Sequence, residues 1–326
     1  MTKPVFDVDI ASTAQSSLDA CVPLALTADV GCFHNAQNLR MPLGIYNISI
    51  TRVCDKLIRL CQRLEAYFKA FKTLDGVEKS DEVMQEIIDY IELSLYAAAE
   101  HVDDIDSIAS GFFKNRAQRD KHIAYRKFLT EIKKHKRLVS SAANAIKHQQ
   151  ARIRLFSMEF AHGTLQGCLH GYFIEGVDAG AVCPSSTFHK DQDAFSITTL
   201  VWEIIVFLLS CSRDLARFLN DVATQIMGPP ASTQFTMFSK AVVSAARLPT
   251  YTFGEEHPFS RVTLHVRSAD GNADPLDSGL YGSIKLGWSK TAPASFGRYV
   301  SRFAGDGKTK SFRFAQPKTL VLHHWD

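Results

Sequence analysis

A long run of apolar residues at helical spacing, from Ile45 to about Arg152, constrains the fold of this chain more than any other feature. In its first part the apolar residues recur mostly every three or four positions, as in a helix with one buried face: Ile48, Val53, Leu57, Leu60, Leu64 and Phe68. Asp75-Gly76 ends this helix at about Leu74, and Ser80-Asp81-Glu82 begins a second that continues to about Phe113. A third is expected over 115–136 and a fourth over 138–152. Four such helices with short connections predict an antiparallel bundle.

Beyond this run the apolar residues recur at every second position. The segment from Ile153 to Phe173 is typical of a β-hairpin that turns near His162-Gly163. A very apolar helix over Ser196 to Leu219 is expected to complete the bundle. From about Thr250, alternating apolar residues separated by Gly, Pro, Asn and Asp predict antiparallel strands.

We therefore expect a mainly α protein, an antiparallel helical bundle with an inserted β-hairpin and a small C-terminal antiparallel β unit. The expected parts are an irregular N-terminal lead-in (1–44), the bundle (45–227) with its hairpin insert near 153–176, and a linker with the β unit (228–326).

Composition narrows the classes of function. The balance of 37 Lys and Arg against 34 Asp and Glu makes the whole chain only slightly basic, so any electrostatic role must be local. The longest apolar run, Ile197 to Cys211, is too short for a membrane span and contains Glu203. The N-terminus places two aspartates where a signal peptide needs an apolar core, which predicts a cytoplasmic protein. Seven scattered cysteines without a CxxC motif are expected to be reduced thiols.

The near-neutral total conceals a strong charge asymmetry. Between Asp75 and Ser110 there are 11 acids against one lysine, and between Gly111 and Arg154 there are 13 cations against two acids. The acidic and basic helices can lie side by side and partly neutralise each other. Alternatively, the basic helices face outward and bind phosphates. The sequence leaves both interpretations open.

The fourth helix divides into two faces. Five polar residues share one stripe, which we term the polar row: Arg137, Ser141, Asn144, His148 and Arg152. The opposite stripe is apolar: Val139, Ala142, Ile146 and Ile153. The helix should bury the second stripe and expose the first, either to solvent or to a ligand. A histidine that transfers protons near neutral pH, beside cations that hold an anionic oxygen, suits phosphate chemistry.

The segment AANAIKHQQARI (142–153) resembles the HEPN superfamily of small helical proteins. Many members carry an Arg, often followed by Asn, and a His a few residues later on the third or fourth helix. The resemblance implies a homodimer in which two such motifs meet in a cleft. It also implies metal-independent RNA cleavage, in which the ribose 2′-hydroxyl attacks the adjacent phosphate, and a role as a toxin of a toxin–antitoxin pair or in phage defence.

The match is partial. Asn144 and His148 stand at the family's Asn and His, and Lys147 fits the Lys-His pairing of many relatives, whereas Ala143 occupies the place of the family's Arg. The candidate catalytic residues are therefore His148, Asn144, Arg152 and Lys147. The candidate RNA-binding residues are Arg137, Ser141, Lys133, Lys134, Lys136 and Arg126.

Other motifs carry less weight. A zinc site from Cys168, His170, Cys183 and His189 fits no regular spacing, and buried thiols are preferred. The sequence contains no P-loop, GxGxxG, HExxH or GxSxG motif. We expect neither a metal nor a cofactor.

Three classes of function remain. The first is an HEPN-like endoribonuclease. The second is a catalytically inactive helical dimer that binds RNA or a protein, which Ala143 favours. The third is a structural protein whose C-terminal β unit contacts a partner or stacks on nucleic acid through aromatic residues interleaved with cations: Tyr281, Trp288, Phe296, Tyr299, Phe312, Phe314 and Trp325.

Overall fold

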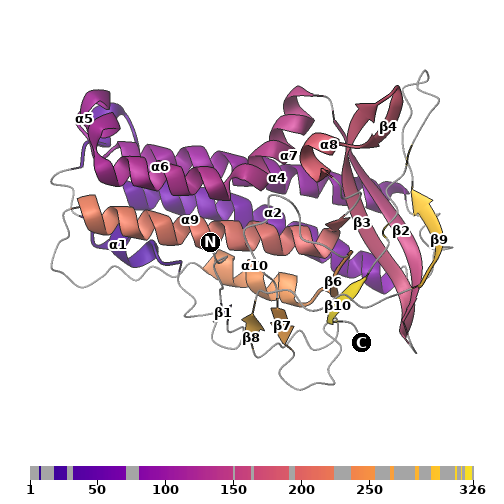
Figure 1. Cartoon of the computed structure of the whole chain (residues 1–326). Coiled ribbons are helices and arrows are strands. Elements are labelled where there is room, and N and C mark those ends of the chain that lie inside the picture. The colour runs from indigo at the N-terminus through magenta and orange to yellow at the C-terminus, as the bar shows by residue number, and fades with distance from the viewer. Residues whose placement is uncertain are drawn as a thin grey trace.

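The computed structural model of the chain is mainly helical, and a β-sheet lies across one end of a bundle of long helices (Figure 1). The structure describes residues 7–8, 18–27, 32–70, 81–149, 151–162, 165–190, 195–223, 236–253, 265–267, 283–285, 295–301, 313, 317 and 320–324. The expected fold class, a bundle of packed helices with antiparallel strands, is confirmed.

The first two long helices lie where the apolar spacing predicts them. Helix α2 (Pro42–Ala70) packs along α4 (Asp81–Ser110), and both bury a stripe of apolar side chains against the bundle. The α2 stripe includes Val53, Leu57, Leu60 and Leu64, which are fully buried.

The third segment is two helices rather than one. Helix α5 (Arg116–Lys121) is capped by Asn115, whose side chain accepts a hydrogen bond from the Gln118 amide at 3.0 Å. His122 then adopts an extended conformation, with φ −74° and ψ 127°, and α6 (Ile123–His135) begins after it. The predicted continuous helix over 115–136 is therefore wrong at His122, because the apolar period does not report a local change of backbone angle.

Helix α7 (Arg137–His148) follows α6 directly and ends earlier than predicted. The Ala151 amide donates to the Ala145 carbonyl at 3.2 Å, a hydrogen bond of the type that closes a helix C-terminus. The Arg152 carbonyl already accepts from the Glu175 amide, at the start of the sheet. Arg152 is thus not on the helix, and its place one helical turn beyond His148 is corrected.

Helix α9 (Ile197–Val222) is the centre of the core. Ser196 caps its N-terminus, and 19 of its 26 residues are buried. It contacts α1 (Cys21–Ala25), α2, α4, α6 and α10 (Thr236–Ala246). The N-terminal lead-in contributes Leu18, Ala20 and Leu24 to this core. The sequence does not predict helix α10, which lies in the segment that is expected to be a linker.

The predicted hairpin is the middle of a larger sheet. Strands β2 (Ile153–His162) and β3 (Leu165–Asp178) pair antiparallel, with Ile153 opposite Ile174. Strand β4 (Ala181–Pro184) continues from β3 through Ala179-Gly180, a two-residue turn in which both φ angles are positive. The short β5 (Phe195–Ser196) also pairs with β3. The sheet meets the bundle at Tyr67 and Phe68, whose rings contact His170 at centroid distances of 4.5 and 4.9 Å.

The C-terminal strands are antiparallel, as predicted, but the described ones do not form a separate unit. Strand β9 (Ser295–Ser301) pairs with β2, and β10 (Val321–His324) pairs with β6 (Thr250–Thr252). Strands β7 (His265–Arg267) and β8 (Ser283–Lys285) pair with each other, and β8 also pairs with β1 (Asp7–Val8). The aromatic side chains that carry the stacking hypothesis lie outside the described side chains.

The helices that the structure describes include none with the length and apolar content needed to cross a membrane.

Several histidines are sealed inside this fold. His101, His170 and His189 are at most 1% exposed, and burial lowers the pKa of each to about 3. His101 meets Ser49 through Nδ1 at 2.7 Å, whereas its Nε2 is buried without a hydrogen-bond partner among the described residues. His170 meets Ser157 in the same way, and its Nε2 is likewise unpartnered. Both rings are therefore neutral, since a charged ring would bury an N–H that nothing accepts.

These histidines make the fold sensitive to acid. An unfolded histidine titrates near 6.5, and the folded pKa of each is about 3, so the unfolded state binds more protons between these values. The stabilisation is complete above pH 6.5 and is lost progressively as the pH falls toward 3. Denaturant titrations at pH 7.5, 6.5, 5.5 and 4.5 should show a falling free energy of unfolding. His101→Gln should flatten this dependence, and a stability that is constant down to pH 4.5 would contradict the assignment.

Candidate functional site

The two faces of α7 are separated as its sequence predicts. Val139 and Ala142 are buried and Ile146 is partly buried, and Ile153, which begins β2, is buried as well. Of the polar row, Arg137, Asn144, His148 and Arg152 are exposed and Ser141 is partly exposed. The bundle therefore fixes which side of α7 faces outward, and it is the side that carries His148.

Asn144 and His148 lie one turn apart near the C-terminal end of α7, about 6 Å along the axis. Neither makes a side-chain hydrogen bond or ion pair with another residue in the described part of the chain. An exposed imidazole and amide placed in this way can give or accept protons and hydrogen bonds from a bound molecule.

Two other candidate catalytic residues face helix α4. The Lys147 ammonium lies 4.5 Å from the centroid of the Tyr96 ring, a cation–π contact. The Arg152 guanidinium lies near the Glu92 carboxylate, where burial and Asp89 raise the pKa of Glu92 and Arg152 opposes them. Lys147 and Arg152, which lie on either side of His148 in the sequence, are therefore directed toward an aromatic ring and a carboxylate of α4.

The place of the missing family arginine is closed. Ala143 is 2% exposed, on the buried side of α7. A long cationic side chain at this position would point into the packed core. Any cation that assists His148 must come from another position.

The candidate RNA-binding residues lie on α6, at the α6–α7 junction and on α7. Arg126, Lys133 and Arg137 are exposed, and Lys134 and Lys136 are partly exposed. Lys134 pairs with Glu131 on the same helix. Arg126, Lys133 and Lys136 make no ion pair with any residue that the structure describes.

The acidic helix α4 finds its described ion-pair partners elsewhere. Arg52 of α2 pairs with Glu100 at 2.8 Å and approaches Asp104 at 3.9 Å, and Arg63 of α2 pairs with Glu86 at 3.2 Å. The acids of α4 thus face the arginines of α2 as well as the basic helices. The described ion pairs of the α4 acids therefore leave cations of α6 exposed to solvent.

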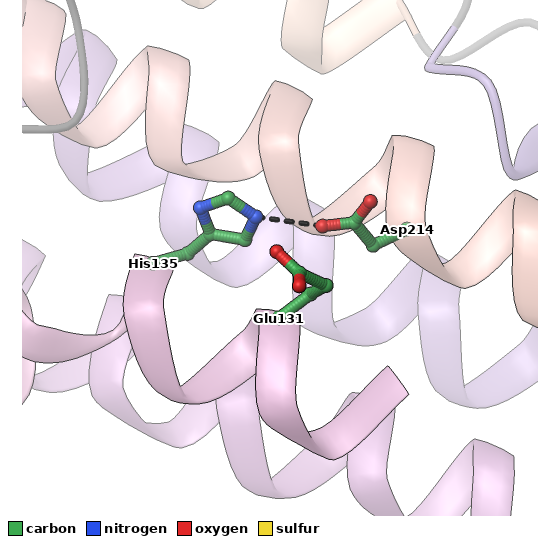
Figure 2. Close-up of side chains that lie close together, drawn as sticks. All are labelled: Glu131, His135 and Asp214. Atoms are coloured by element: carbon green, nitrogen blue, oxygen red, sulfur yellow. Dashed lines mark hydrogen bonds and ion pairs between the residues drawn. The ribbon is translucent and has the colours of Figure 1, made fainter. Parts of the chain in front are cut away.

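A second cluster joins α6 to α9. His135 Nε2 lies 2.6 Å from Asp214 Oδ2, and Glu131 lies one turn before His135 (Figure 2). The three side chains offer ligand atoms within 4.8 Å of one another, a grouping that can hold a metal ion. Glu131 and Asp214 also line a hollow of about 110 Å³ between the two helices.

The ion pairs and hydrogen bonds of this cluster indicate a structural contact between α6 and α9, which we term the joint, rather than a metal site. Arg217 Nη1 pairs with Asp214 Oδ1 at 3.0 Å, and Lys134 pairs with Glu131, so both carboxylates already have cations. The other ring nitrogen of His135, Nδ1, is buried and has no hydrogen-bond partner among the described residues. The ring is therefore best satisfied with its proton on Nε2, donated to Asp214, and a metal would need that position.

Asp214 is ionised in this joint. Burial raises its pKa, but the hydrogen bond from His135 and the positive charges of Arg213 and Arg217 outweigh burial and leave the pKa below its usual value. The sequence alone does not predict the cluster, because His135 and Asp214 are 79 residues apart and Glu-x-x-x-His on an amphipathic helix is not a distinctive motif.

The weakly favoured zinc ligands are not brought together. All four are buried: Cys168, His170, Cys183 and His189. His189 Nε2 accepts the Ile174 amide at 2.9 Å, and His170 is held by Ser157 and the rings of Tyr67 and Phe68. His170 and Cys168 belong to the packed core of the sheet and bundle, whereas Cys183 lies on β4 beside Arg313.

The joint generates a stability prediction. Asp214→Ala should lower the free energy of unfolding by roughly 1 to 3 kcal/mol, because it leaves the buried His135 Nε2–H without an acceptor. Arg217→Ala removes a 66% exposed partner of the same carboxylate and should cost only about 0 to 1 kcal/mol. Urea unfolding of both variants at pH 7.5 measures the difference. Equal losses would show that the His135–Asp214 contact adds nothing to the fold.

Comparison with known proteins adds no relative. No family model matches the chain, and no curated protein or solved structure is similar to it.

Proposed function

We propose that this chain binds RNA across the exposed faces of α6 and α7 and cleaves it without a metal ion, with His148 as the acid–base group. The observation that carries the proposal is the exposure of Asn144 and His148, which have no side-chain partner among the described residues, on a helix whose other face is buried. The HEPN resemblance supports the same assignment and adds the expectation of a homodimer with a toxin or phage-defence role.

The cations of α6 and of the α6–α7 junction support binding to a polyanion. Arg126, Lys133 and Lys136 are available to phosphates, and Arg137 begins the helix that carries His148. Arg137 lies about 16 Å from His148 along α7, which is farther than one phosphate extends. It would contact a neighbouring phosphate of the same strand, or the reacting phosphate in a dimer.

The reaction needs only groups that the helix and the RNA supply. The His148 imidazole takes the proton of the ribose 2′-hydroxyl, and the 2′-oxygen bonds to phosphorus. The bond from phosphorus to the 5′-oxygen breaks, and the imidazolium returns its proton to that oxygen. The products are a 2′,3′-cyclic phosphate and a 5′-hydroxyl. Asn144 would donate a hydrogen bond to a phosphate oxygen, and Arg152 would offset its charge.

Ala143 favours a second candidate, an RNA-binding bundle that does not cleave. The position of the family's arginine is buried, Lys147 is held on Tyr96, and Arg152 lies near Glu92. In this case the same surface would bind RNA while lacking the cation needed in the transition state.

The third class, contact through the C-terminal strands, receives less support. Arg313, one of its cations, pairs with Asp178, and its amide donates to the Val182 carbonyl at 2.8 Å. Arg313 therefore stabilises the turn between β3 and β4.

Cleavage is tested by incubating the purified chain with single-stranded RNA in EDTA. The proposal expects cyclic-phosphate ends and a loss of at least about 100-fold in rate for His148→Ala, the scale of a lost acid–base group. His122→Ala is the matched control, because His122 is also exposed and lies outside α7. Wild-type chain that binds RNA but leaves it intact supports the second candidate. Equal cleavage by wild type and His148→Ala would refute the role of His148.

Binding is tested by its salt dependence. Replacing Arg126, Lys133 and Lys136 by alanine should reduce the slope of log K against log salt by about 2, or about 0.7 for each lost contact with a single strand. The control replaces Arg52, Arg63 and Lys69, three cations of α2 that pair with the chain's own acids. Titrations by fluorescence anisotropy from 50 to 300 mM KCl give the slopes. A reduction in the control of the same size would place the RNA on another face.

A further inference from the structure

A short segment of the N-terminal part docks on the C-terminal end of α4. The Phe33 amide donates to the Gly111 carbonyl at 2.8 Å, and the Gln37 side-chain amide donates to the Phe113 carbonyl at 2.8 Å. The last carbonyls of a helix have no partner within it, so this segment satisfies groups that would otherwise need water.

His34 is the centre of this contact. It is fully buried, and its Nε2 lies 3.0 Å from the Ile108 carbonyl in the last turn of α4. A Cβ at Gly111 would lie 2.4 Å from the same ring, so the backbone can approach His34 only because position 111 is glycine. The Phe112 ring meets His34 edge to face at 5.2 Å. The imidazole is thus held in one orientation.

This orientation determines which nitrogen carries the proton. A carbonyl can only accept, so Nε2 must be protonated and donate to Ile108. Burial lowers the pKa of His34, against an opposing effect of the Ile108 hydrogen bond, which keeps the ring neutral near pH 7. The lone pair is then on Nδ1.

That lone pair faces a thiol. Cys32 Sγ lies 2.6 Å from His34 Nδ1, so the S–H donates to the imidazole. A thiol, a base and a third group that orients the base form the arrangement that activates cysteine nucleophiles. Here the orienting group is a main-chain carbonyl.

Cys32 also differs from the other cysteines. It is partly exposed, whereas the other six are buried. Burial raises the pKa of Cys21 and of Cys168 to about 12, and it raises those of Cys54, Cys61 and Cys211 as well. Thiols in such surroundings are inert. Cys183 is also buried, and its sulfur contacts the Arg313 guanidinium rather than a base. Of the seven cysteines, Cys32 alone is partly exposed, and it has an imidazole beside it.

We propose that Cys32 and His34 form a reactive thiol–imidazole pair and that Cys32 is a site of reversible S-thiolation by small disulfides of the glutathione type. The thiol proton moves to Nδ1 as Sγ attacks one sulfur of the disulfide. A new S–S bond forms, the original S–S bond breaks, and the departing thiolate takes the proton from His34. Cys32 is oxidised and the departing sulfur is reduced. An external thiol reverses the reaction.

The experiment follows modification of the full chain by oxidised glutathione with intact-mass analysis and peptide mapping. One glutathionyl group per chain is expected, on Cys32, and Cys32→Ser should remain unmodified. Because the base is built in, the initial rate should change by less than about threefold between pH 6.5 and 8, whereas an ordinary thiol of pKa near 8.5 gains roughly tenfold per pH unit below its pKa.

His34→Gln tests the role of the imidazole, since the amide can still donate to Ile108 but offers no base. At pH 6.5 its rate should fall about tenfold, and its pH dependence should become that of an ordinary thiol. Circular dichroism checks that this variant is folded, and if it is not, the wild-type pH profile decides. Modification spread over several cysteines, no modification, or a wild-type rate at Cys32 that rises tenfold per pH unit would overturn the proposal.

Discussion

The burial of α9 is the constraint on which the rest of this structure depends. Nineteen of its residues are buried, and they pack against the apolar faces of helices from both the N-terminal and the middle parts of the chain. Helix α6 turns Tyr125, Phe128 and Ile132 inward, and the joint between His135 and Asp214 holds it against α9. The lysines and arginines between these positions therefore face outward. The basic surface of α6 is therefore a consequence of how its apolar residues pack.

The histidines of this chain serve two purposes that the packing separates. His101, His170 and His189 are neutral parts of the core, and His135 joins two helices. His148 is exposed on a helix that is buried on its other side, among polar side chains and cations. A histidine in the core is explained by its partners in the fold, whereas one placed like His148 has none in the described part of the chain, and the proposed function assigns its role to contact with RNA.

Periodicity in the sequence predicts the helices and the faces of α7, because burial of one stripe is a local property that spacing reports. It does not predict the break at His122, the end of α7 at His148, or the helix that begins at Thr236, since these depend on backbone angles and distant contacts. For the candidate site, the exposure of Asn144 and His148 is predicted and confirmed. The contacts of Lys147 with Tyr96 and of Arg152 with Glu92 are not predicted, nor is the pair His135–Asp214, because they form only when separate segments of the chain meet. The pair Cys32–His34 is not predicted either, because the orientation of its ring depends on the distant Ile108 carbonyl.

Ultraviolet cross-linking of a short single-stranded RNA, followed by mass spectrometry of the peptides, tests whether RNA lies on the outward faces of α6 and α7. If it does, cross-links fall within residues 126–152, including the peptide that carries His148, and they are lost at high salt. Cross-links confined to the C-terminal strands, or none at all under conditions in which RNA is retained, would contradict this placement.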